Sequence, residues 1–185
     1  MTFASGRIML AGMAITPDGL VFRRTARVLI VDEDDRVLLF FGGGLVRQDA
    51  DYHFTVGGGV DEGESLAEAA VREVFEETGL RVDPEALGGS VARTEGPWTT
   101  HDGVRFYSDD NFFFLRVKHF EPDLSGLTEG EWREISHHGW LSLDDLAATD
   151  AIVFPIGLAG ILKRLLSGER FEAPVEMPWT DQSRD

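Results

Sequence analysis

Runs of apolar residues separated by short polar breaks predict several strands in the first third of the chain. Residues 26–31 are all apolar apart from Arg27, so both faces of the expected strand are apolar. This pattern is typical of a strand buried on both faces. Four acidic residues follow at 32–35, and a second apolar run occupies residues 37–41. Two such runs around a short break predict a hairpin with a solvated acidic turn. The turn lacks the glycine and the distal glutamate that a calcium-binding loop requires.

Later apolar runs predict further strands of different lengths. Residues 42–51 combine glycines with mixed polarity and indicate a loop. A short strand is expected over 52–56 and runs into three glycines at 57–59, where the backbone adopts unusual dihedral angles or is closely approached. Residues 90–93 form another expected strand, and residues 104–120 are expected to form two.

Three segments carry helical patterns. Residues 65–78 begin with a capping box between Ser65 and Glu68, and Gly79 stops the helix. Shorter helices are expected over 142–148 and over 155–166, the latter with proline at its start and glycine past its end. The order strands, helix, strands, helix, helix predicts an α/β fold, with a mixed sheet and helices packed on its faces.

The length of 185 residues suits one domain. We expect an N-terminal extension over 1–22, a domain over 23–170 and a loose C-terminal tail over 171–185. The apolar stretch at 8–15 is far shorter than the roughly 20 residues of a membrane span. It faintly resembles a signal peptide, but a ragged extension, or a start of translation at one of two later methionines, is the favoured interpretation.

Composition narrows the functional classes. The chain has 43% apolar residues and no cysteine, which excludes a wholly disordered chain, disulfides and a cysteine nucleophile. The absence of cysteine does not determine the compartment, but it is compatible with a reducing cytosol. We expect a cytoplasmic protein. With 17 basic and 33 acidic residues the net charge is −16, which disfavours nucleic-acid polymers and anionic membranes as partners. An anionic substrate would therefore need a cation to mediate its binding.

Three glutamates gather on one side of the expected helix. At about 100° per residue, Glu73, Glu76 and Glu77 share one arc, while alanines and valines form a packing stripe beside it. Like charges at these spacings repel by about 0.2–0.5 kcal/mol per pair. A bound Mg²⁺ would replace this repulsion between carboxylates with attraction to the ion, because Mg²⁺ prefers a few carboxylate ligands completed by water and phosphate. An ordinary acidic solvent face is the competing interpretation of the three glutamates alone.

The surrounding spacing removes that ambiguity. Residues 58–80 read GGVDEGESLAEAAVREVFEETGL and fit the pattern G-x5-E-x7-R-E-U-x-E-E-x-G-U, where U is aliphatic. A chance match of this pattern is on the order of 10⁻⁸ at background residue frequencies. The pattern resembles the Nudix box, the signature of the Nudix hydrolase family, with no position broken. Its matching residues are Gly58, Glu64, Arg72, Glu73, Val74, Glu76, Glu77, Gly79 and Leu80.

The resemblance implies both a fold and a reaction. The fold would be an α/β/α sandwich with a mixed sheet, in which the box forms a loop, a helix and a loop. The reaction would be hydrolysis of a nucleoside diphosphate linked to another group, with Mg²⁺ or Mn²⁺ as cofactor. By position, the metal ligands would be Glu73, Glu76, Glu77 and the carbonyl of Gly57. Arg72 would orient the glutamates, and the structural positions of the box would be Gly58, Glu64 and Gly79.

Such a reaction needs a group that accepts a proton from the attacking water. Glu73 is the first candidate, and Glu129, Glu131 and Glu134 are alternatives on a later expected loop, with surface roles as the competing interpretation. Outside the box, the candidates for substrate contact are His53, Trp98 and Phe106, for which packing roles compete.

We expect a metal-dependent pyrophosphohydrolase whose partner is a small-molecule nucleotide. Nucleoside triphosphates, damaged ones included, cleaved to the monophosphate and pyrophosphate, rank ahead of ADP-ribose and nucleotide sugars. Three rivals fit less well: a Nudix-fold ligand sensor usually loses box glutamates, the isomerase branch depends on a cysteine, and an acidic interaction module would not need the box. Homodimers are common among members of the family, so a homodimer is one expectation.

Overall fold

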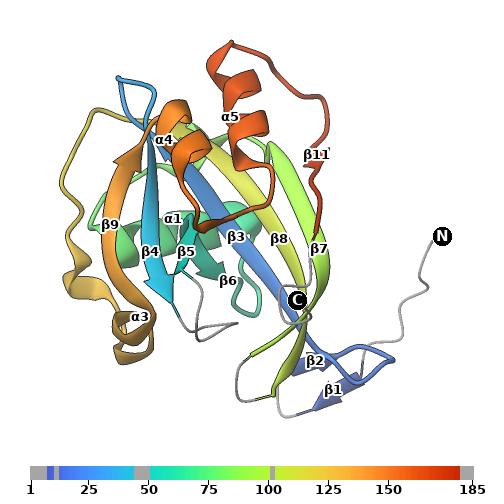
Figure 1. Ribbon diagram of the computed structural model, residues 1–185. Coiled ribbons are helices and arrows are strands. Elements are labelled where there is room, and N and C mark those ends of the chain that lie inside the picture. The colour runs from blue at the N-terminus through green and yellow to red at the C-terminus, as the bar shows by residue number, and fades with distance from the viewer. Residues whose placement is uncertain (1–7, 11–12, 44–50, 101–102, 180–185) are drawn as a thin grey trace.

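The computed structural model describes residues 8–10, 13–43, 51–100 and 103–179. Within these ranges eleven strands form one mixed sheet, with helices on both of its faces (Figure 1). The strands are β1 (Ile8–Leu10), β2 (Met13–Ile15), β3 (Val21–Val31), β4 (Val37–Gly43), β5 (Asp51–Phe54), β6 (Val56–Gly59), β7 (Ala92–Thr99), β8 (Arg105–Arg116), β9 (Ile135–Leu141), β10 (Ile152–Phe154) and β11 (Val175–Glu176). The helices are α1 (Leu66–Thr78), α2 (Pro84–Leu87), α3 (Glu129–Glu134), α4 (Leu143–Ala148) and α5 (Leu158–Leu166), with a 3₁₀ turn over Leu124–Gly126.

Strand β3 is the centre of the sheet. It pairs in parallel with β8 along its whole length, and antiparallel with β6 and with the start of β4. Its alternate residues enter different cores: Ala26 and Val28 face α1, while Leu29 and Val31 face α4 and α5. The predicted strand buried on both faces is confirmed, and so is the α/β fold with helices on both sides of a mixed sheet.

Helix α1 begins and ends where the sequence predicts. Ser65 and Glu68 form the reciprocal capping box, and Gly79 adopts the left-handed conformation, with φ of 72°, that ends the helix. The helix packs on the sheet through Ala70 and Val74, both fully buried. The helix contacts both β3 and β6, and its buried Glu73 and Glu77 lie against the glycines of β6.

The hairpin between β3 and β4 is confirmed, but the prediction of a solvated turn is wrong at Asp32. The carboxylate of Asp32 is fully buried and accepts hydrogen bonds from the backbone N–H groups of Asp34 and Arg36 and from the Arg36 guanidinium. Burial acts to raise the pKa of Asp32, but the hydrogen bonds from Arg36 and His119 outweigh it and lower the pKa. The buried Asp32 carboxylate therefore stabilises the turn through hydrogen bonds to its backbone.

Several predicted boundaries differ from the observed ones because long-range pairing overrides local pattern. The segment expected to form two strands is the single strand β8, which β3 and β7 pair on either side. The glycines at 57–59 lie in β6, which pairs with β3. Helix α5 begins at Leu158 because the residues before it form β10 on the edge of β5. Of the loop expected over 42–51, residues 44–50 lie outside the described ranges.

Described segments near each end of the chain pair with the sheet. Strands β1 and β2, within the expected N-terminal extension, form a hairpin that continues into β3. The prediction of a loose tail is wrong for residues 175–179, because β11 pairs with β7 and Met177 packs on the core. The domain limits 1–22, 23–170 and 171–185 stay a prediction. Among the described residues, no helix has the length and apolarity needed to cross a bilayer.

Candidate active site

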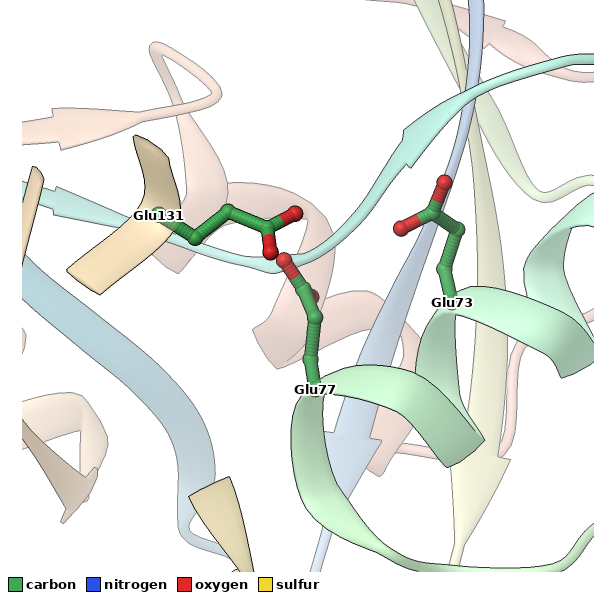
Figure 2. Close-up of side chains that lie close together, drawn as sticks. All are labelled: Glu73, Glu77 and Glu131. Atoms are coloured by element: carbon green, nitrogen blue, oxygen red, sulfur yellow. The ribbon is translucent and has the colours of Figure 1, made fainter. Parts of the chain in front are cut away.

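Three glutamates from two helices converge on one point. Glu73 and Glu77 of α1 and Glu131 of α3 each present a carboxylate oxygen, and these oxygens all lie within 4.8 Å of one another (Figure 2). Glu73 and Glu77 stand four residues apart, so they share a face of α1. Both are buried, with exposed fractions of 6% and 5%. We call Glu73, Glu77 and Glu131 the glutamate cluster.

The glycines of β6 make room for these buried carboxylates. A Cβ atom at Gly58 would lie 2.6 Å from Oε1 of Glu73, so a side chain there would displace the carboxylate. The N–H of Gly57 donates a hydrogen bond of 2.7 Å to Oε2 of Glu77. Gly57 has φ of 128°, and a Cβ atom there would lie 2.3 Å from the carbonyl oxygen of Ala26. Strand β6 therefore needs glycine at both positions, for different reasons.

The cluster is electrostatically unfavourable as a set of bare anions. Burial raises the pKa of Glu77 to about 8, although the hydrogen bond from Gly57 opposes this shift. Burial also raises the pKa of Glu73, against the lowering effect of Arg72. A divalent cation would relieve this penalty, and converging carboxylate oxygens are the donors that hard cations prefer. The residues present thus fit a Mg²⁺ or Mn²⁺ ion.

Arg72 donates hydrogen bonds to four other residues within 58–80. Its Nε and Nη2 atoms each donate a 3.0 Å hydrogen bond to Glu64, and Nη2 also donates to the carbonyl of Gly59 at 2.8 Å. Its Nη1 atom donates to Glu73 at 2.8 Å and to Glu76 at 3.1 Å. This arrangement agrees with the expected orienting role, which stays a prediction. The bonds from Arg72 lower the pKa of Glu64, so that carboxylate is held as an anion.

The structure separates Glu76 from the other two box glutamates. Its side chain is 49% exposed and bonds to Arg72, and its oxygens do not belong to the glutamate cluster. The expected ligand Gly57 directs its carbonyl oxygen to the Arg27 guanidinium at 3.2 Å. Of the three later alternatives, Glu131 joins the cluster and Glu129 is exposed, while the side chain of Glu134 lies outside the described set. The roles of all these residues stay predictions.

A cavity of about 420 Å³ opens beside the cluster. All three cluster glutamates line it, as do Arg23 and Arg27 of β3. Trp98 of β7 and Phe106 of β8 also line it, with their rings stacked at 4.8 Å between centroids. His53 is not among its lining residues; it packs edge-on against Phe41, and burial lowers its pKa. The cavity thus combines carboxylates, two cations and aromatic faces.

Among the lining residues that the sequence did not single out are two arginines of β3 and two residues near the C-terminus. Arg27 had a signal, since it is the one charged residue within an otherwise apolar strand segment. Arg23 stands four residues earlier, on the same face of β3. Pro178 and Trp179 had no signal, because they follow a stretch with no periodicity.

Comparisons with known proteins agree with this geometry. A family model described as NUDIX domain matches residues 21–157. A curated relative, "Putative 8-oxo-dGTP diphosphatase" of Bacillus subtilis (strain 168), is 32% identical over 94 residues, which are 51% of this chain and 53% of the relative. The chain thus spans about half the length of the curated relative that it matches.

Two solved structures have a similar fold. The MutT protein from Methanosarcina mazei Go1 has a TM-score of 0.55 at 21% identity, covering 81% of this chain and 96% of that one. The dihydroneopterin triphosphate pyrophosphohydrolase of E. coli also has a TM-score of 0.55, at 22% identity, covering 80% of this chain and 99% of that one. At these identities the likeness shows the fold alone.

Proposed function

The chain belongs to the NUDIX domain family, and on that premise we propose that it hydrolyses a nucleoside triphosphate to the monophosphate and pyrophosphate. Nudix hydrolases act on phosphoanhydride bonds. The observation that carries the proposal is the glutamate cluster, which opens into a cavity that also contains Arg23 and Arg27. Carboxylates for a cation and arginines for anions are the complement of a polyphosphate.

Glu73, Glu77 and Glu131 would hold Mg²⁺ or Mn²⁺, with Glu76 and the Gly57 carbonyl as further ligands proposed from the box. When bound, the ion supplies positive charge to the phosphate oxygens and lowers the pKa of a bound water. Arg27 keeps its guanidinium at the cavity wall through hydrogen bonds to the carbonyls of Thr55 and Gly57. Its remaining N–H donors can face a phosphate oxygen.

The proton from the attacking water would pass to a carboxylate oxygen of the cluster. Glu73 is our first candidate, because its carboxylate belongs to the cluster and the 2.8 Å bond from Arg72 fixes its orientation. Glu131 is the alternative. Its Oε2 atom accepts from the N–H and hydroxyl of Thr128, so its other oxygen can serve the cluster.

The substrate class is supported by the cavity and by the curated relative from Bacillus. That relative is named for 8-oxo-dGTP, a triphosphate with an oxidised purine base. Trp98 and Phe106 give the cavity aromatic surface on which such a base could stack. We therefore place nucleoside triphosphates, oxidised purines included, ahead of ADP-ribose and nucleotide sugars.

A nucleotide panel tests the proposal. The purified chain is incubated with dGTP, 8-oxo-dGTP or ADP-ribose and Mg²⁺, and the products are resolved by phosphorus NMR. We expect a nucleoside monophosphate with pyrophosphate from the triphosphates, and no turnover in excess EDTA. Glu77→Gln serves as the inactive control. Full activity in EDTA, or release of base or sugar with the anhydride intact, would overturn the assignment, and preferential cleavage of ADP-ribose would move it to the other substrate class.

A further inference from the structure

The C-terminal segment beyond the matched family domain runs along the cavity. Residues 175–179, which we call the C-terminal strap, lie outside the matched range of 21–157. Strap residue Val175 donates its N–H to the carbonyl of Val91 at 3.0 Å, and Met177 donates to that of Arg93 at 2.8 Å. The hydroxyl of Thr94 lies 3.2 Å from the carbonyl oxygens of both Met177 and Pro178 and can donate its hydrogen to either. These bonds keep the strap on β7 up to the cavity.

The Trp179 indole packs against β7 at Gly96, which has no side chain. A Cβ atom at Gly96 would lie 2.2 Å from Cδ1 of the Trp179 indole, and its nearest neighbours would all be indole atoms. The indole N–H donates to the carbonyl of Pro97 at 2.9 Å. The ring is therefore fixed at one edge by a hydrogen bond and on one side by the backbone.

The strap and the glutamate cluster line the same cavity from different sides. Pro178 and Trp179 contribute to the wall near Trp98 and Phe106, while the carboxylates enter from α1 and α3. A nucleotide whose phosphates lie at the cluster must direct its base away from the carboxylates. Away from the cluster the cavity wall includes aromatic side chains, and stacking on an aromatic face is how proteins hold a base with little dependence on its identity.

We propose that the C-terminal strap forms a wall of the substrate cavity and that the Trp179 indole contacts the base of the bound nucleotide. This inference rests on the proposed function, because it takes the ligand to be a nucleotide. It assigns substrate binding to a residue outside the family domain. Gly96 acts as a positioning residue, since its lack of a side chain lets the indole lie against β7.

Equilibrium binding separates a base contact from a structural role. Two probes are titrated calorimetrically with Mg²⁺: a dGTP analogue with a methylene group between the α and β phosphorus atoms, and inorganic triphosphate, which has no base. Trp179→Ala should weaken binding of the analogue about tenfold or more, as expected for a lost stacking partner. It should leave binding of triphosphate unchanged. Glu172→Ala, an exposed change beside the strap, is the matched control.

Gly96→Ala supplies a second variant that keeps the tryptophan but displaces its ring. Alone it should weaken binding of the analogue as Trp179→Ala does, and added to Trp179→Ala it should cost nothing further. Equal weakening for both probes, or none for the analogue, overturns the inference. Pyrophosphate release from dGTP by the unaltered chain tests the proposed function separately, so the two failures can be told apart.

Discussion

Glu77 is a carboxylate whose ionisation is opposed by its surroundings. Its side chain is 5% exposed, and burial raises its pKa to about 8 from the ordinary value of 4.5. Between these values the folded, metal-free chain binds a proton that the unfolded chain has lost. The stability contributed by the neutral form is thus fully present below pH 4.5 and is lost as the pH rises through about 8.

Glu77→Gln should remove this pH dependence. In EDTA at about pH 5 the variant and the unaltered chain should have similar free energies of unfolding, because both side chains are neutral. At about pH 9 the variant should be more stable by about 1 kcal/mol or more, since it has no buried anion. Urea unfolding at the two pH values measures this difference. A variant that is less stable at the higher pH would contradict the raised pKa.

Glu76 and Glu77 should differ in their effect on turnover, although the sequence pattern treats them alike. Glu77→Gln removes a carboxylate of the cluster and should lower turnover about a hundredfold or more. Glu76, proposed as a further ligand, is half-exposed, lies outside the cluster and bonds to Arg72, so Glu76→Gln should lower turnover by clearly less. Initial rates with saturating Mg²⁺ compare the two. Equal losses would mean that Glu76 moves into the cluster when metal and substrate bind.

Strand β6 shapes the site because Gly57 and Gly58 have no side chains. It lies between β3 and α1, so its residues meet the backbone of β3 on one side and the glutamates on the other. Two adjacent glycines therefore have different neighbours: carboxylate atoms of Glu73 at Gly58, and backbone atoms of Ala26 and Arg27 at Gly57.

Alanine at these glycines should separate activity from stability. Gly58→Ala should fold, because a side chain can move away, but turnover should fall at least about tenfold as Glu73 is displaced. Gly57→Ala meets immobile backbone at a positive φ and should cost about 2 kcal/mol or more of stability. Urea unfolding and initial rates on both variants test this. Loss of folding in Gly58→Ala would show that the backbone cannot accommodate the change.

Helix α1 and the loop before it are joined by the fork of Arg72. Two parallel bonds to Glu64 and further bonds to Glu73 and Gly59 require a planar group with several donors. Arg72→Lys should therefore lower the free energy of unfolding by about 1–2 kcal/mol, even though the charge is kept. The midpoint of urea unfolding measures it, with Arg81→Lys on a neighbouring exposed loop as the control. Equal midpoints for Arg72→Lys and the unaltered chain would mean that the bonds from Arg72 do not stabilise the fold.

At the scale of the whole molecule, binding of a cation would be coupled to the protonation of Glu77. The cluster receives two glutamates from the α1 layer and one from α3, while the cavity beside it is walled by β3, β7, β8 and the C-terminal strap. Because burial keeps Glu77 neutral below about pH 8 in the metal-free chain, binding of a cation must release its proton. Affinity for the cation should then rise with pH.

Mg²⁺ should raise the melting temperature more at about pH 8.5 than at about pH 6, since stabilisation grows with affinity. Melting curves with and without MgCl₂ at the two pH values measure this, and calorimetry in buffers of different ionisation enthalpy counts the protons released. Glu77→Gln is the control and should show a much smaller metal effect at both values. An equal shift at both pH values for the unaltered chain would mean that Glu77 is already ionised.

The sequence determined the features that depend on neighbours along the chain. The cap and stop of α1, the double burial of β3 and the shared border of Glu73 and Glu77 all follow from spacings of a few residues, where backbone geometry alone sets direction. The box pattern also indicated the family. The same reasoning grouped Glu76 with Glu73 and Glu77, because the position of a residue around a helix does not show which neighbouring elements bury its side chain.

Only the tertiary structure decided which distant residues complete the site. Glu131 reaches the cluster because α3 leads into β9, which pairs with β4 in the sheet, and the sequence could not rank it above its two neighbours. The His119 ring reaches the buried Asp32 from 87 residues away, and Trp179 reaches the cavity because β11 pairs with β7. Each of these contacts joins segments whose meeting depends on the packing of the whole sheet, and no local spacing encodes that packing.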